Sequence, residues 1–163
     1  MDTFYEPTAT ELNHLRRCVK LARTALEDGD EPFGSVLVDV EGRVLFEDRN
    51  RVNGGDATRH PEFEIARWAA EHQLPAERAA STVYTSGEHC AMCAAAHGWV
   101  GLGRIVYAAS SAQLSQWMAE WGEPAGPVAA LPVTAVVPGA DVAGPVAELE
   151  DEIRALHARQ RGR

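Results

Sequence analysis

The sequence predicts one α/β domain built around a mixed sheet, and three observations support that prediction. Stretches with helical and strand-like patterns alternate after an initial hairpin, as in layered α/β domains. The 163 residues fit a single domain, which we expect to span residues 1–163. Hydrophobic residues make up 45% of the chain and charged residues 24%, which is enough apolar material for a core without disulfides.

The N-terminal third is predicted to be a helix followed by a hairpin. Apolar residues recur at helical spacing over residues 8–26, and the run EDGD then ends the helix. Residues 34–40 and 43–48 are predicted to be strands, because Glu41 and Gly42 between them form a turn.

The middle of the chain is predicted to contribute a helix, a strand and a further helix. The segment HPEFEIARWAAEH, residues 60–72, is expected to be helical with Pro61 in its first turn, the position that proline tolerates best. Residues 81–85 are predicted to form a short strand. The small residues over 91–100 are predicted to form a helix that Gly101 ends.

The C-terminal third is predicted to repeat this alternation. A strand over residues 104–108 precedes a helix over 112–121, and a strand over 131–137 precedes a final helix over 145–160. The stretch GEPAGPVAALP, rich in proline and glycine, joins these elements and is too short to divide domains.

Composition and charge indicate where the protein works and what it binds. Its three cysteines are an odd number with no secreted framework, which favours a reducing compartment. There is no signal-peptide pattern and no apolar stretch near the roughly 20 residues that span a bilayer, so we expect a cytoplasmic protein without a membrane partner. The net charge of −9 favours a small uncharged or cationic substrate over tRNA or DNA, although the tail ARQRGR is one basic candidate.

Two motifs contain most of the chemistry. Cys90 and Cys93 form a CxxC pair at a strand-to-helix junction, and His60 opens an HPE motif at a similar junction upstream. The CxxC pair alone is compatible with a redox pair, a structural zinc knuckle or a catalytic metal site. With His60 there are three zinc ligands, the number typical of catalytic sites, whereas structural sites close with four. The candidates for a fourth ligand are Cys18, His89 and His97.

Glu62 favours the catalytic interpretation. Residues two apart on a helix point about 200° apart, so His60 and Glu62 share a site only if they stand at the very start of the helix. The cysteines also fall at the head of a helix, and the positive ends of two helices would help keep thiolates ionised. A carboxylate beside the metal but not bound to it is suited to move a proton from water. Alternatively, Glu62 only stabilises the N-terminus of the helix through its negative charge.

Together, HxE and a distant CxxC resemble the signature of the zinc nucleobase deaminases. The stretches HPE and EHCAMC match it, except that His89 stands where the family usually has proline. The chain is therefore identified as a member of the cytidine deaminase-like superfamily, nearest the guanine deaminase and tRNA adenosine deaminase branch. PFGSV and NRVNGGDATRHPE resemble that branch's PFGAV and N…DPTAHAE, and the resemblance covers residues 32–107.

The resemblance implies a fold, a cofactor and a reaction. The fold would be a three-layer α-β-α sandwich with a mixed five-stranded sheet. The cofactor would be Zn²⁺, held by His60, Cys90 and Cys93. The reaction would release ammonia hydrolytically, with Glu62 as the catalytic residue that passes a proton from water to the ring nitrogen and the leaving amine. Asn50 matches the asparagine with which the branch contacts the base, and a turn asparagine is its alternative role.

Other side chains near the motifs have two interpretations each. Phe33 matches a pocket-side phenylalanine that contacts substrate in the branch, or it is ordinary core. His89 either lines the substrate pocket as a titratable ring or is a tolerated replacement that points away. Trp117 and Trp121 either stack on a base or pack the face of their helix. We expect packing or a surface role for His97, and we assign no role to His14, His72 and His157.

The substrate is left open among several small heterocycles. The stretch SSAQLSQW lacks the aspartate that guanine deaminases typically carry there, with Gln113 nearest its position, and the charged tail lacks that branch's aromatic closing segment. We expect a zinc-dependent aminohydrolase that acts on a cyclic amidine, namely a free base or nucleoside of the cytosine, triazine or aminopurine type. The alternatives are guanine deaminase proper, a tRNA adenosine deaminase and a non-catalytic zinc-stabilised binding module. By analogy with the family we expect a homodimer.

Overall fold

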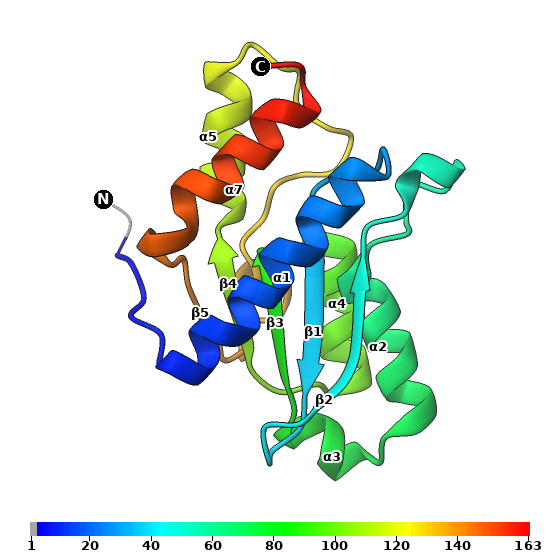
Figure 1. The fold of residues 1–163 in the computed structure, drawn as a ribbon. Coiled ribbons are helices and arrows are strands. Elements are labelled where there is room, and N and C mark those ends of the chain that lie inside the picture. Colours follow the sequence, from blue (N-terminus) through cyan, green and yellow to red (C-terminus); the bar gives the residue numbers. More distant parts are fainter. Residues whose placement is uncertain (1–2) are drawn as a thin grey trace.

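The computed structural model describes residues 3–163, and a five-stranded mixed sheet lies at its centre (Figure 1). The strand order is β2-β1-β3-β4-β5. β1 is antiparallel to both β2 and β3, whereas β3, β4 and β5 run parallel. The strands are β1 Gly34–Val38, β2 Val44–Arg49, β3 Thr82–Gly87, β4 Ile105–Ala109 and β5 Val142–Ala143.

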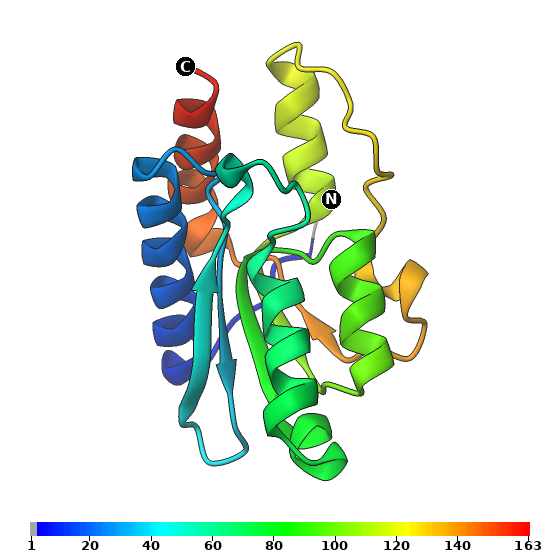
Figure 2. The same cartoon turned by 90° about the vertical axis from the view of Figure 1, so that its right-hand side faces the viewer.

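Helices cover both faces of this sheet, so the predicted three-layer α-β-α sandwich is confirmed. α1 and α7 lie on one face and α2 and α4 on the other, as the side view shows (Figure 2). The helices are α1 Ala9–Glu27, α2 Pro61–His72, α3 Pro75–Ala80, α4 Ala91–Val100, α5 Ser111–Glu120, α6 Val133–Val136 and α7 Ala147–Gln160, with a short 3-10 helix η1 at Val52–Gly54. In the part of the chain that the structure describes, no helix is both long and apolar enough to cross a bilayer.

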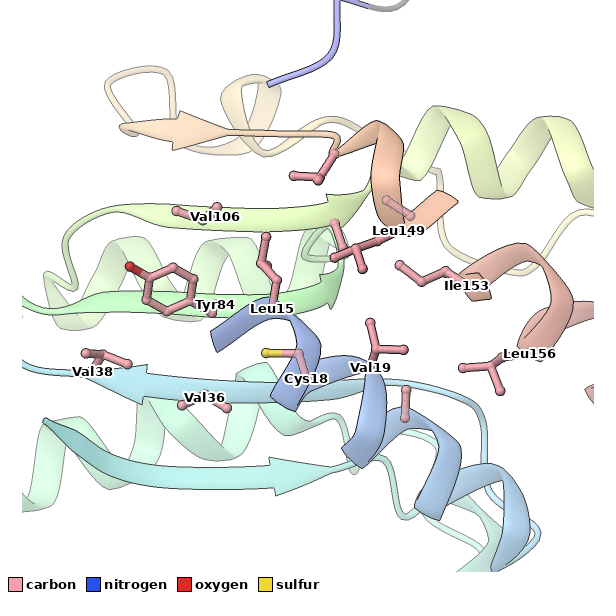
Figure 3. Close-up of a cluster of buried hydrophobic side chains, with 14 of the residues drawn as sticks. Leu15, Cys18, Val19, Val36, Val38, Tyr84, Val106, Leu149, Ile153 and Leu156 are labelled. Carbon is pink, nitrogen blue, oxygen red and sulfur yellow. The ribbon is translucent and has the colours of Figure 1, made fainter. Parts of the chain in front are cut away.

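The core between the sheet and the layer of α1 and α7 is the larger of the two (Figure 3). Cys18 of α1 is fully buried there, beside Leu15 and Val36. Burial raises the pKa of the Cys18 thiol, so it is a packing residue. Among the described residues, Cys18 is outside the group of side chains that could hold a metal.

The predicted strand over residues 131–137 is wrong. The segment forms the short helix α6, which begins after Pro132 at its N-cap. Val133 packs in a small buried cluster with Ala94 of α4 and Ile105 of β4. The apolar residues of this segment are thus buried by packing against α4 and β4. They can be buried in this way without pairing as a strand. The fifth strand is β5, which comes later and has only two residues.

The short helix α3 was absent from the predicted elements. It begins with Pro75, and the Glu77 side chain accepts a hydrogen bond of 2.6 Å from the Leu74 backbone N–H. Proline at the first helical position and glutamate at the third are ordinary start signals. They were overlooked because the helix has only six residues and none of them is buried.

Candidate active site

Two helix N-termini meet at the predicted metal site. His60 is the N-cap of α2 and Cys90 is the N-cap of α4, and both have extended backbones. Pro61 takes the first position of α2, where its missing N–H removes no helical hydrogen bond. His60 stands before the first helical residue, so the 200° rotation between residues two apart on a helix does not apply to it. Its side chain can therefore lie on the same side as that of Glu62.

The three proposed ligand atoms are spaced as zinc requires. The Nδ1 atom of His60 lies 3.6 Å from the Sγ atom of Cys90 and 3.6 Å from that of Cys93. Tetrahedral zinc, with its usual bond lengths to nitrogen and sulfur, holds such atoms about 3.6 Å apart. Within residues 3–163 no fourth histidine, cysteine or carboxylate joins this group. The donor set therefore fits a zinc ion with an open coordination position.

Electrostatics at the group favour a metal ligand in its ionised form. A hydrogen bond from Cys93 is the main cause that lowers the pKa of Cys90 to about 4, and His60 acts in the same direction. The same hydrogen bond, together with burial, raises the pKa of Cys93. The hydrogen bond from Cys93 and the His60 ring both favour the thiolate form of Cys90, which is the form that binds a metal.

Glu62 is buried beside this group and is held by two hydroxyl groups. The Ser35 hydroxyl donates to its Oε1 atom at 3.0 Å, and the Thr85 hydroxyl donates to the same atom at 2.8 Å. Ser35 and Thr85 face each other across the antiparallel pair of β1 and β3. Burial raises the pKa of Glu62. Since both hydroxyls hold Oε1, the second oxygen, Oε2, is the one available for proton transfer.

A cavity of about 190 Å³ opens at these residues. His60, Glu62 and Cys90 line it, together with Phe33 and Trp117. The structure thus places Phe33 in the wall of this cavity. Trp117 lines the cavity and is also packed in the main core, as its packing interpretation requires, and its stacking on a base stays a prediction.

Asn50 is fully buried next to the cavity-lining residue Glu31. Its Oδ1 atom accepts hydrogen bonds from the backbone N–H groups of Glu31 at 3.3 Å and Val52 at 3.1 Å. Its Nδ2 atom has no partner in the described chain. Asn50 is not one of the residues that line the cavity, so its contact with substrate stays a prediction.

His89 lies away from the cavity wall. Its ring is 1% exposed and packs edge-on against His97, with ring centroids 5.3 Å apart. The His97 ring in turn contacts the backbone oxygen of Gly103 at 2.7 Å. Neither histidine is within the ligand group or among the cavity-lining residues. The predicted substrate contact of His89 therefore stays a prediction.

Several residues at the site had no role in the sequence-based hypothesis. Ser35 carried a weak signal, because it replaces the alanine of PFGAV, but its contact depends on the pairing of β1 with β3. His157 lines the cavity from α7, although it had been assigned no role. Gln113 proves to be a capping residue, since its side chain accepts a hydrogen bond of 2.8 Å from the Ser110 backbone N–H.

Comparison with known families agrees with this geometry. Residues 8–109 match the family described as the cytidine and deoxycytidylate deaminase zinc-binding region. The chain belongs to this family. This deaminase is thus an enzyme that removes an amino group by hydrolysis, and its His60, Cys90 and Cys93 fit a Zn²⁺ ion.

Individual relatives of this deaminase differ in their substrates. It is 33% identical over 118 residues to a probable cytosine deaminase of Schizosaccharomyces pombe, covering 72% of each chain. It is 36% identical over 89 residues to the tRNA-specific adenosine deaminase of Agrobacterium fabrum, covering 54% of this chain and 58% of that one. A solved guanine deaminase of Nitrosomonas europaea shares the fold, with a TM-score of 0.73 at 21% identity over 99% of this chain and 90% of that one.

Proposed function

We propose that this deaminase is a zinc-dependent enzyme that converts a neutral base or nucleoside of the cytosine type into its oxo product and ammonia. The observation that supports this most directly is the position of Glu62, a buried carboxylate that lines the same cavity as the three zinc-type ligands and is not one of them. A structural zinc site has no use for such a carboxylate. The relative that is a probable cytosine deaminase supports the choice of base.

Different residues of the chain would bind the metal, transfer protons and position the proton-transferring group. His60, Cys90 and Cys93 would hold zinc, which when bound supplies a Lewis acid that makes water a nucleophile at neutral pH. Glu62 would take one proton of the water at Oε2 and deliver it to the ring nitrogen, and would then carry the second proton of the water to the amine, which leaves as ammonia. Ser35 and Thr85 keep the other oxygen of Glu62 fixed during these transfers.

The lining of the cavity supports a substrate without phosphate. Of the described residues that line it, none is lysine or arginine, whereas Glu31, Glu62 and Glu88 are acidic. Phosphate groups are bound by arginine, lysine or free backbone N–H groups. A negatively charged nucleotide would therefore be repelled, and a neutral ring would not.

Charge also argues against tRNA as the substrate. The net charge is −9, and two arginines of the basic tail fold back onto the protein. The Arg161 guanidinium lies 5.8 Å from the centroid of the Trp121 ring, and Arg163 donates to the Trp121 backbone oxygen at 2.5 Å.

We keep a homodimer as the proposed assembly, consistent with Trp99, which is 91% exposed on α4. Analytical ultracentrifugation measures that assembly.

The test is ammonia release from cytosine, cytidine, guanine, an aminotriazine and tRNA. We expect turnover of cytosine or cytidine by the wild type and a loss of about a thousandfold in Glu62→Gln, because a positioned acid-base group contributes roughly 10²–10⁴ in rate. The variant should retain stoichiometric zinc by mass spectrometry. Glu64→Gln is the matched control, because Glu64 lies on the same helix and pairs with Arg59 at 3.2 Å outside the cavity. Full activity of Glu62→Gln would refute the mechanism, and turnover of tRNA alone would refute the substrate class.

A further inference from the structure

His157 is a cavity-lining residue that comes from the layer of α1 and α7. It lies near the end of α7, on the face of the sheet opposite to α2 and α4 (Figure 2). It nevertheless lines the same cavity as His60 and Glu62. The cavity therefore has a polar group that the metal-binding helices do not supply.

The His157 ring lacks a partner for its buried polar atom. The residue is 2% exposed, and its Nδ1 atom has no hydrogen-bond partner in the described chain. A buried polar atom without a partner is unfavourable for the folded state. Among the described cavity-lining residues, His157 is the one with such an atom in its side chain. Nδ1 is closed off from the cavity, whereas the other ring nitrogen, Nε2, is not fully buried and has no hydrogen bond within the described chain, so Nε2 is the atom available to a ligand.

Aromatic neighbours fix the ring and shape the wall for a flat molecule. The His157 centroid lies 5.0 Å from that of Phe33 in an edge-on arrangement and 6.4 Å from that of Trp117. All three residues line the cavity. Planar heterocycles are bound between such apolar walls, and a few polar groups then set their orientation.

Two of the three acidic side chains of the wall, Glu62 and Glu88, are already engaged. The Glu88 carboxylate accepts hydrogen bonds of 2.9 Å from the backbone N–H groups of Ser111 and Val133. Glu62 is held for proton transfer by Ser35 and Thr85. His157 is different, because burial lowers its pKa to about 3 and keeps the ring neutral. A neutral imidazole has one donor and one acceptor nitrogen.

We propose that His157 determines substrate specificity by hydrogen bonding the edge of the heterocycle that lies away from the departing amino group. The substrate class is then an amino-heterocycle with a second hydrogen-bonding group on that edge, such as the 2-oxo group of cytosine. This inference rests on the proposed function and names one of its specificity contacts.

Two substrates that differ at that edge of the ring test the inference. Cytosine carries the 2-oxo group and the adjacent N1–H group, and 4-aminopyrimidine lacks both. Replacing the ring in His157→Phe should lower kcat/KM for cytosine by about tenfold or more, because a site built to hydrogen-bond a polar group discriminates strongly by that contact. The value for 4-aminopyrimidine should stay within about twofold, because it has no such group to lose. His157→Gln, which keeps a donor and an acceptor, should recover part of the loss.

Equal losses for both substrates, or no loss for either, would overturn the inference. A binding measurement separates it from the proposed function. Calorimetry with cytosine is done on Glu62→Gln and on Glu62→Gln combined with His157→Phe, and the second should bind at least about tenfold more weakly. Equal affinity, or no binding to either protein, overturns the role of His157. Absence of ammonia release by the wild type from any substrate instead refutes the proposed function.

Discussion

At the scale of single residues, Glu62 depends on the two hydroxyl groups that hold its Oε1 atom. The hydroxyl oxygens of Ser35 and Thr85 are also 2.8 Å apart, so the three side chains form one buried cluster. Removing the Ser35 hydroxyl leaves Oε1 held by Thr85 alone. A hydrogen bond to a charged group contributes about 1.5–3 kcal/mol. Ser35→Ala should therefore lower kcat by about tenfold or more while KM changes little. Steady-state kinetics with the best substrate of the screen measures both.

The matched control for Ser35→Ala is Ser81→Ala. The Ser81 hydroxyl is also buried and accepts a hydrogen bond of 2.9 Å from Gln73, but it does not touch Glu62. Its loss should cost stability and leave kcat unchanged. If Ser35→Ala raised KM and kept kcat, the hydroxyl would serve binding and not the position of Glu62.

Residues differ in how far the sequence alone reveals them. His60, Cys90 and Cys93 were predictable as one group because zinc chemistry limits the residue types and both motifs begin helices. The contact of Ser35 with Glu62 depends on strand register, and that of His157 depends on where the last helix packs. Neither of these two contacts can be read from a local pattern in the chain.

At the scale of elements, α1 packs closely on β1 because Gly34 has no side chain. A Cβ atom added there would lie 2.4 Å from the Cys18 carbonyl oxygen and 2.5 Å from the Leu21 Cβ atom. Backbone cannot move away from such an overlap without separating the layers. Gly34→Ala should lower the free energy of unfolding by about 1–3 kcal/mol. This corresponds to a melting temperature lower by roughly 3–10 °C, which calorimetry measures.

Gly54→Ala is the control for this close approach. Gly54 lies in η1, and a Cβ atom there would meet no atom within 4 Å. Its melting temperature should match that of the wild type. Equal melting temperatures for Gly34→Ala and Gly54→Ala would show that α1 shifts without cost.

Elements with both a periodic pattern and clear end signals were predictable. α4 was predicted with its observed bounds, Ala91–Val100, because Gly101 ends it with a φ of 75° that glycine adopts readily. The elements α6 and β5 were not predictable. With four and two residues, they are too short to show a helical or strand periodicity. Their state is decided by contacts with α4 and β4, which are distant in sequence.

At the scale of the whole molecule, the cavity joins parts from both helical layers. The metal-type ligands come from α2 and α4, and His157 comes from α7 across the sheet. Phe33 and Trp117 complete the wall from the loop before β1 and from α5. The metal-type ligands and His157 thus belong to different layers, so we expect substitutions in α7 to change selectivity and leave the metal group intact.

The buried clusters predict how the fold responds to metal removal. The core of α1 and α7 and the second cluster around Leu37 and Ile65 do not include His60, Cys90 or Cys93. We therefore expect the metal-free protein to stay folded and zinc to raise its stability by linkage. At a free zinc concentration of 1,000 times Kd the gain is about 4 kcal/mol, or roughly 8–16 °C in melting temperature. Calorimetry with a chelator and with zinc measures this shift.

Cys90→Ala should lose the shift, whereas Cys18→Ala should melt lower and keep it, because Cys18 is a core residue. Retention of the shift in Cys90→Ala would refute the ligand assignment, and its loss in Cys18→Ala would identify a fourth ligand.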